Sequence, residues 1–349
     1  MALARVPESG WARLWTAPAR RVWAHTASPE FFRRSAQVTV WALAIGIVSG
    51  GAVRLTGSGL GCKDWPACTR TSVVAPFAYH AWVEFGNRLV EAALTAGIAL
   101  VAVAAYRRRP RRRDLVWLGL ALLGGTFGEV VLGGEVVLHK LAPAWVMGHF
   151  WLSMALLVVA VLLFHRSRLA DVTARQPAGR ATVTPARCLV RRGQLVASRA
   201  MLAWTFVVVA LGTVVTSTGP HAGAPGVPRF HFLSLYRAAQ LHGSSVEMLL
   251  ALTVFTLWWM QRSRVDRTVL RRAEVLLVVL VSQAAVGYTQ YFTGDPVVLV
   301  GLHLAGATTV VVAMCWFNFG LFARQGAESR AGAGAWRSDP ITEPELVST

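Results

Sequence analysis

The chain has 349 residues, of which 54% are hydrophobic and only 15% are charged, and its mean hydropathy is +0.48. This composition excludes an ordinary soluble domain and is typical of a membrane protein with several spans. The formal net charge of +18 does not indicate nucleic-acid binding. The arginines lie in short clusters between apolar runs, as they do in the cytoplasmic loops of membrane proteins.

Eight apolar runs are each close to or above the ~20 residues that a helix needs to cross a bilayer. The sequence therefore predicts an all-α membrane protein with eight transmembrane helices. Their approximate ranges, in chain order, are 35–53, 80–105, 114–137, 143–165, 199–218, 239–261, 272–292 and 297–323.

The distribution of Lys and Arg predicts the orientation of these spans. Of the 35 basic residues, 28 lie in the N-terminal segment, the even-numbered loops and the C-terminal segment, and 6 lie in the odd-numbered loops. Because cytoplasmic loops are enriched in Lys and Arg, we expect a multi-pass protein of the cell membrane with both termini in the cytoplasm. The first 34 residues hold six arginines and no apolar signal-peptide region, which predicts a cytoplasmic tail.

The two halves of the sequence share several features. The first and fifth apolar runs end in small residues followed by a Gly/Ser/Thr loop, and the fourth and eighth each carry a proline followed by a histidine. Because each half has four spans, both halves would enter the membrane in the same direction. The sequence therefore predicts a parallel repeat of two four-helix bundles. The predicted divisions are an N-terminal tail at 1–34, a bundle at 35–165, a linker at 166–198, a bundle at 199–323 and a C-terminal tail at 324–349.

The second apolar run carries an unusual set of polar side chains. Glu84, Asn87, Arg88 and Glu91 are three or four residues apart, so they share one face of a helix. Ionisable groups at this depth are costly in hydrocarbon, so they face the bundle interior and indicate a functional site. The alternative is that Glu84 and Arg88 form an ion pair that only fixes helix packing.

Three histidines lie inside predicted spans, namely His149, His242 and His303, and Asn87 occupies the fourth equivalent position. At about 1.5 Å per residue, all four fall at a similar depth below the outer surface. His242 and His303 belong to one half and could bind opposite faces of a haem, as in four-helix haem proteins. Hydrogen bonding between helices is the alternative role for these histidines.

Two cysteines, Cys62 and Cys68, lie close together in the first outer loop. Disulfides persist outside the cytoplasm, and closing so short a loop would contribute about 2–3 kcal/mol, so we expect a disulfide here. A structural and a redox-active disulfide both fit the spacing. Two thiols without further clustered ligands do not indicate a metal site. Cys188 and Cys315 are expected to be free thiols.

The ordered set of motifs resembles haem A synthase, the membrane enzyme that oxidises a methyl group of haem O to the formyl group of haem A. The resemblance runs from about residue 40 to residue 320. It is carried by Arg54–Leu60, Cys62–Cys68, Glu84–Arg88, Leu141–Pro143 with His149, Thr218–Gly223, Gln240–His242 and Val300–His303.

The resemblance implies a role for each matching residue. His242 and His303 would hold a permanent haem B in the C-terminal half. The N-terminal half would receive the haem O substrate, with Glu84 as its essential glutamate and His149 as a ligand to the iron. Asn87 stands where the family usually has a second histidine, so it would be a weak ligand, a hydrogen-bond donor or a spacer.

Cofactors and partners follow from the same resemblance. Oxidation of an unactivated methyl group is beyond side chains alone, so a cofactor must supply the chemistry. Arg54 and Arg88, with Arg229 and Arg237, are candidates for pairing with haem propionates. Expected partners are the farnesyltransferase that produces haem O, oxidase assembly factors and membrane lipid, and no nucleic acid.

Three other functions compete with this one. A dihaem b-type cytochrome that takes electrons from quinol without modifying haem would need the same C-terminal histidines but gives no reason for Glu84. A transporter would fit a parallel repeat with buried charges but not the histidines at matching depth. A purely structural assembly factor is the third alternative.

Overall fold

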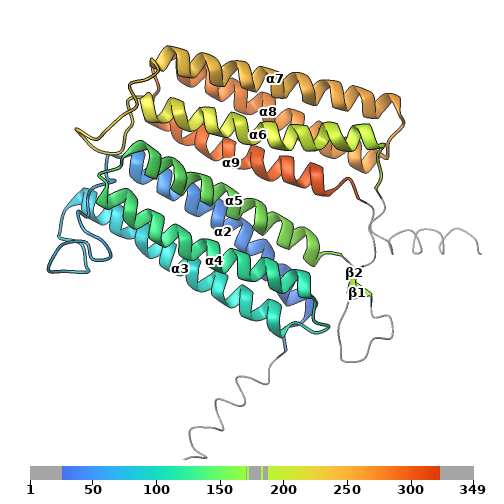
Figure 1. Cartoon of the computed structure of the whole chain (residues 1–349), viewed down its shortest axis with the longest axis horizontal. Helices are drawn as coiled ribbons and strands as arrows, with labels where there is room; N and C mark the ends of the chain where they lie inside the picture. Colours follow the sequence, from blue (N-terminus) through green and yellow to red (C-terminus); the bar gives the residue numbers. More distant parts are fainter. Residues whose placement is uncertain (1–25, 170, 173–181, 184–187, 323–349) are drawn as a thin grey trace, which may run out of the picture.

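The computed structural model describes residues 26–169, 171–172, 182–183 and 188–322. Within these residues it has eight long helices and one two-stranded antiparallel ladder, so the predicted helical fold is confirmed (Figure 1). The helices are α2 (Pro29–Leu55), α3 (Tyr79–Arg107), α4 (Arg113–Leu138), α5 (Pro143–Ser167), α6 (Arg192–Thr218), α7 (Leu235–Arg262), α8 (Arg267–Phe292) and α9 (Val297–Phe319), and the strands are β1 (Asp171–Val172) and β2 (Thr182–Val183).

Seven of the described helices are long and apolar enough to cross a membrane, and α8 is the exception. With 26 residues α8 has the length of a span. Its first turns, however, carry three arginines and a glutamate, and its second half carries several amide and hydroxyl side chains. The structure therefore supports an integral membrane protein with seven such helices, and the eighth span stays a prediction.

Four helices, α2, α6, α7 and α8, begin four or more residues before their apolar runs, and α2 and α6 extend furthest. α2 starts at Pro29, where the hydroxyl of Ser28 accepts a hydrogen bond of 3.1 Å from the N–H of Phe31. Proline is well suited to the first position of a helix, because the N–H that it lacks would have no partner there. α6 starts at Arg192, inside the predicted linker. Polar first turns thus extend these helices beyond the stretch that hydropathy detects.

Parts of the predicted tails and linker lie outside the described residues. These parts are residues 1–25 of the N-terminal tail, all of the C-terminal tail at 324–349, and residues 170, 173–181 and 184–187 of the linker.

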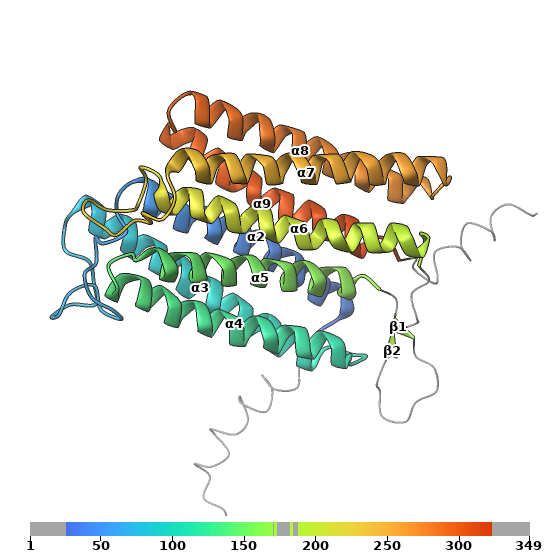
Figure 2. The same ribbon diagram turned by 45° about the horizontal axis from the view of Figure 1, so that its top comes forward.

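The helices form two neighbouring groups, seen in both Figure 1 and Figure 2. In the first group α2 packs on α3 and α5, and α4 packs on α3 and α5. In the second group α7 packs on α6 and α8, and α9 packs on α6 and α8. α9 also packs on α2 and α5, so it joins the two groups. Its Val311 and Cys315 belong to the core of the first group, whereas Met314 and Phe317 belong to the core of the second.

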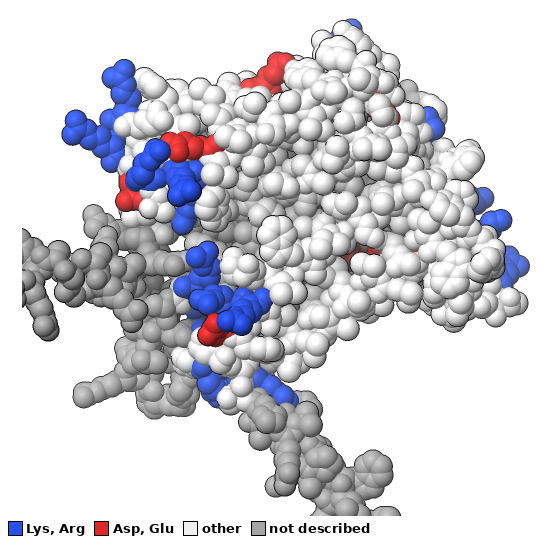
Figure 3. Space-filling view, turned by 180° about the vertical axis from the view of Figure 1, so that it is seen from behind, with Lys and Arg blue, Asp and Glu red and all other residues white. Residues whose placement is uncertain are grey.

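Charged side chains gather at the two ends of the helices. Figure 3 shows a broad, largely uncharged surface between these ends on the face that it presents, with acidic atoms recessed near its middle. Such a band is what contact with the hydrocarbon of a bilayer requires, because a charged side chain at that depth costs several kcal/mol. The charge distribution agrees with the apolar helices in indicating a membrane protein.

Candidate functional site

His242 on α7 and His303 on α9 lie opposite each other in the second helix group. Their ring centroids are 6.2 Å apart and their planes differ by 79°. Nδ1 of His242 lies 3.1 Å from the main-chain oxygen of Val208 on α6, and Nδ1 of His303 lies 3.0 Å from Nε2 of Gln283 on α8. All four helices of this group therefore contribute to holding the two rings.

Glycines make room for both imidazoles. A Cβ added at Gly212 on α6 would lie 3.1 Å from Cε1 of His242, and one added at Gly287 on α8 would lie 2.8 Å from Cε1 of His303. The 2.8 Å distance at Gly287 is shorter than two non-bonded carbon atoms allow, so the ring or the backbone would have to move. Glycine at these positions therefore lets each ring approach the backbone of the neighbouring helix.

The donor set of this pair fits a haem iron. Within the described part of the chain neither Nε2 atom makes a hydrogen bond, while each Nδ1 atom has a partner. For His242 this contact matches histidines that bind metal, whose second ring nitrogen commonly donates to a carbonyl or carboxylate oxygen. No group of three or more His, Cys, Asp or Glu that could hold a bare metal ion occurs among the described residues. A haem needs only two axial ligands from the protein.

His149 on α5 is the corresponding histidine of the first helix group, and it pairs with Glu129 on α4. Nδ1 of His149 lies 2.5 Å from Oε2 of Glu129, and the hydroxyl of Ser153 donates a hydrogen bond of 3.0 Å to Oε1 of the same carboxylate. Both members of the ion pair are mostly buried, with exposed side-chain fractions of 28% and 14%. Oε1 of the carboxylate thus has a hydrogen-bond donor, and Oε2 lies in direct contact with the imidazole.

Asn87 on α3 has its own set of partners in this group. Its Oδ1 accepts a hydrogen bond of 2.8 Å from the hydroxyl of Ser49 on α2, and its Nδ2 donates one of 2.7 Å to Glu91. Together with His149 and Glu129, these contacts place polar side chains from all four helices inside the first group.

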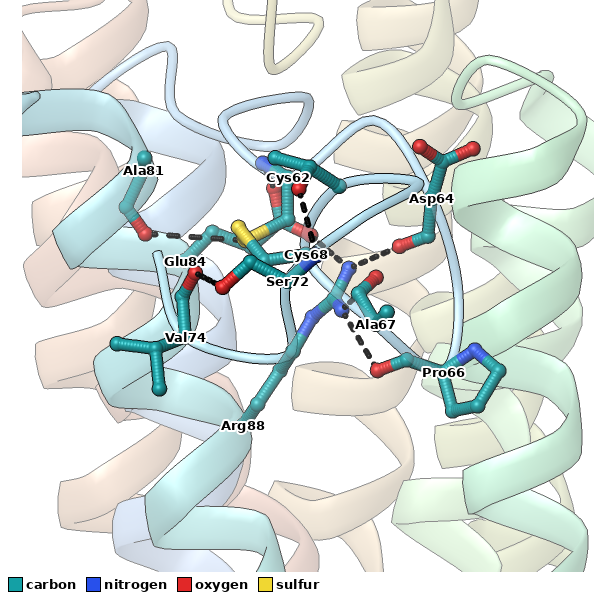
Figure 4. Close-up of a disulfide and its surroundings, with 11 residues drawn as sticks. Cys62, Asp64, Pro66, Ala67, Cys68, Ser72, Val74, Ala81, Glu84 and Arg88 are labelled. Carbon is teal, nitrogen blue, oxygen red and sulfur yellow. Dashed lines mark hydrogen bonds and ion pairs between the residues drawn. A yellow bond between two sulfur atoms is a disulfide. The ribbon is translucent and has the colours of Figure 1, made fainter. Parts of the chain in front are cut away.

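Glu84 and Arg88 lie in the first turns of α3, where they hold the α2–α3 loop that is predicted to face outward (Figure 4). Oε1 of Glu84 pairs with Arg88 at 2.7 Å, and its Oε2 accepts a hydrogen bond of 2.8 Å from the main-chain N–H of Cys62. Arg88 donates to the main-chain oxygens of Asp64 at 3.1 Å and Ala67 at 3.2 Å. The pair therefore does more than fix helix packing, because it connects α3 to the loop.

Cys62 and Cys68 form the predicted disulfide within this loop (Figure 4). Both residues are fully buried. Trp65, between them, lies against α4, where a Cβ added at Gly134 would come within 2.7 Å of its ring. The loop thus covers the outer ends of both α3 and α4. Cys188 and Cys315 are free thiols, as predicted.

Arg54 at the end of α2 connects the two helix groups at the same end of the molecule as the α2–α3 loop. Its Nε donates a hydrogen bond of 2.7 Å to the main-chain oxygen of His221, and its Nη2 donates one of 2.9 Å to that of Thr216. Nearby, the N–H of Gly59 donates to the main-chain oxygen of Gly223 at 3.0 Å. Arg54 and Arg88, both expected near haem propionates, thus each donate to main-chain oxygens.

Comparison with known proteins places the chain in a family. Residues 33–225 match the model of the COX15-CtaA family, described as cytochrome oxidase assembly protein, and this stretch is more than half of the chain. The chain belongs to this family. The relationship predicted from the sequence motifs is thereby confirmed.

Curated relatives of this family member carry the name Heme A synthase. The relative from Geobacillus kaustophilus is 31% identical over 141 residues, which cover 39% of this chain and 44% of the relative. The one from Halalkalibacterium halodurans is 26% identical over 269 residues, covering 75% and 85%, and the one from Shouchella clausii is 22% identical over 282 residues, covering 78% and 91%. The chain thus spans less than half the length of the first of these relatives and most of the other two.

In this member of the cytochrome oxidase assembly family, two polar residues of the first group, Ser49 and Glu129, were not singled out from the sequence, whereas Glu91 was predicted to face the bundle interior. Glu129 had a detectable signal, because it is an ionisable residue inside the apolar run at 114–137. Ser49 had none, since serine is common in membrane helices and only packing brings it to Asn87.

Proposed function

We propose that this protein is a haem A synthase, an oxidoreductase that converts a methyl group of haem O to the formyl group of haem A for terminal oxidase assembly. The observation that carries the proposal is the facing pair of His242 and His303, with Nδ1 held and Nε2 available on each ring, in a chain of this family. The first helix group adds a second histidine site, with buried carboxylates around it, that can receive a substrate haem.

The test is extraction of the haems from purified protein. An enzyme of this kind should contain haem B together with haem O or haem A. Haem B alone would favour the dihaem b-type cytochrome that takes electrons from quinol without modifying haem. The absence of any haem would overturn the proposal and favour a transporter or a structural assembly factor.

In the proposed enzyme His242 and His303 hold haem B in the C-terminal half. When bound, the haem supplies the one-electron chemistry that amino-acid side chains lack. The main-chain oxygen of Val208 orients the ring of His242, and the glycines beside the rings allow their close approach to the backbone. These contacts fix the two ligands before the haem arrives.

We further propose that the two helix groups are parallel repeats, each a four-helix bundle with the boundaries predicted at 35–165 and 199–323. Supporting this, the α4–α5 and α8–α9 turns share an unusual backbone. Lys140 and Leu141 have φ of +53° and +58°, and Gly294 and Asp295 have φ of +78° and +57°. Positive φ is uncommon outside glycine, so two matched pairs are informative. With eight spans this arrangement would put both termini on one side of the membrane, and the Lys and Arg distribution predicts that this side is the cytoplasm.

The N-terminal bundle is the proposed site for haem O, with His149 as the one strong protein ligand to its iron. The ion pair with Glu129 engages Nδ1, so Nε2 is the ring nitrogen left for the metal. Asn87 already forms hydrogen bonds with Ser49 and Glu91. An amide is also a poorer iron ligand than an imidazole. We therefore propose that the side of the haem opposite His149 is open or weakly occupied.

Glu84 is the proposed essential carboxylate. It is 5% exposed and lies one helical turn before Asn87, which suits a group that moves protons near a substrate. Its contacts with Cys62 and Arg88 keep the carboxylate in place. Arg54 and Arg88 each retain further N–H groups, because a guanidinium has five, and these are proposed to pair with haem propionates.

The proposed partners follow from the reaction. Haem O must come from the farnesyltransferase that makes it, and haem A must pass to oxidase assembly factors. Both haems carry an apolar farnesyl chain beside their propionates, so exchange within the membrane is expected. The dihaem cytochrome remains the second candidate, and the buried Glu84 argues against it because electron transfer alone does not require this carboxylate.

A further inference from the structure

Glu129 and Gln283 occupy the same position relative to a histidine of the proposed repeat. Glu129 precedes His149 by twenty residues, and Gln283 precedes His303 by twenty residues. In both cases the first residue lies on the penultimate helix of its group, α4 or α8, and reaches Nδ1 of the histidine on the last helix, α5 or α9.

The surroundings of the two pairs also correspond. Gly133 and Gly287 each lie four residues after Glu129 or Gln283. A Cβ added at Gly133 would lie 3.5 Å from Cε1 of His149, and one added at Gly287 would lie 2.8 Å from Cε1 of His303. Each histidine is therefore held between a glycine and a polar side chain of the preceding helix.

The chemistry of the two contacts differs. Glu129 carries a carboxylate that can only accept from Nδ1–H, and Ser153 donates to its other oxygen. Gln283 carries a neutral amide whose Nε2 lies 3.0 Å from Nδ1 and also donates to the main-chain oxygen of His303 at 2.8 Å. An anion that accepts from the far nitrogen of a ligating histidine increases the basicity of that ligand.

We propose that Glu129 and Gln283 are equivalent positioning residues whose different charges make His149 a stronger electron donor to its iron than His303. The inference rests on the proposed function, in which these two histidines bind haem iron. A stronger donor favours the ferric state, so Glu129 lowers the midpoint potential of the haem in the first group. The amide of Gln283 leaves the potential of haem B higher, which assigns different potentials to two otherwise similar sites.

Reciprocal substitutions test this assignment. Glu129→Gln should raise the midpoint potential of the haem bound in the first group, and Gln283→Glu should lower that of haem B. Both are measured by redox titration of the Soret and α bands, with electron paramagnetic resonance as a second readout of ligand strength. Glu135→Gln is the matched control. Glu135 is also on α4 and also pairs with a histidine, His139 at 3.2 Å, but this pair is largely exposed.

The outcomes separate this inference from the proposed function. The inference is supported if the midpoint potential rises in Glu129→Gln, falls in Gln283→Glu and does not change in Glu135→Gln. Unchanged potentials in variants that retain their haems overturn it, even if the protein makes haem A. If Gln283→Glu loses haem B, Glu129→Gln decides alone, and an unchanged potential of the haem in the first group then counts against the inference. A wild-type protein without haem overturns the proposed function itself.

Discussion

The main-chain N–H of Cys62 donates a hydrogen bond of 2.8 Å to Oε2 of Glu84. The carboxylate proposed to act on the substrate therefore also ties the disulfide loop to α3. Arg88 strengthens this connection, because it pairs with Glu84 and donates to loop carbonyls. Substitutions at Glu84 must consequently be read for loop stability as well as for turnover.

Glu84→Gln should abolish haem A formation while the protein folds and keeps haem B. Loss of a general acid or base typically lowers the rate about 10²-fold or more, so unreacted haem O should accumulate. Haem extraction and a thermal melt of the same sample give the two readouts. Glu247→Gln, at an exposed acid on α7, serves as control.

A purely structural role for Glu84 gives a different result. Breaking a buried ion pair costs about 3–5 kcal/mol, so Glu84→Gln would then lower stability and haem content together. A variant that still makes haem A at the normal rate would refute the catalytic proposal.

Replacing both Cys62 and Cys68 by serine should lower the free energy of unfolding by about 2–3 kcal/mol and leave haem B bound. The loop is held independently by Glu84 and Arg88, so the second helix group should be unaffected. In the wild type, thiol labelling of intact cells should detect these cysteines only after reduction. Ready labelling without reductant would contradict a disulfide in the native protein.

His242→Ala and His303→Ala should each remove the low-spin Soret band of haem B from protein that still inserts into the membrane. Each variant deletes one of two axial ligands, and the remaining one cannot maintain six-coordinate iron. His139→Ala, at an exposed histidine stacked on Trp145, is the control. Persistence of the band in both variants would remove the assignment of these ligands.

Asn87→His should shift the haem O-loaded protein towards low-spin, two-histidine ligation. The substitution places an imidazole at the depth of His149, at the cost of the hydrogen bonds to Ser49 and Glu91. Optical and electron paramagnetic resonance spectra measure the change. An unaltered spectrum would show that position 87 does not face the iron.

Gly287→Ala should weaken haem B binding, because the new methyl group would lie 2.8 Å from Cε1 of His303 and push the ring aside. Gly124→Ala is matched to it, since an added Cβ there meets nothing within 4 Å. Haem B content per protein is the measurement. Equal content in the two variants would mean that close approach to α8 is not needed.

The sequence by itself determined the helices, the disulfide and the levels of the histidines. Apolar runs of spanning length must satisfy their backbone groups internally, so the run lengths predicted eight helices, all of which are present in the described residues. A fixed rise per residue predicts that His149, His242 and His303 lie at similar depths. The six-residue separation of Cys62 and Cys68 permitted their disulfide.

Only the tertiary structure decided which side chains meet. Contacts between helices depend on how each helix is rotated and shifted against its neighbours, and no single-helix pattern contains that information. Glu129 could not be matched to His149, nor Gln283 to His303, until α4 packed on α5 and α8 on α9. The link from Glu84 to the disulfide loop likewise exists because the loop folds back over the outer end of α3, where the carboxylate meets a main-chain N–H.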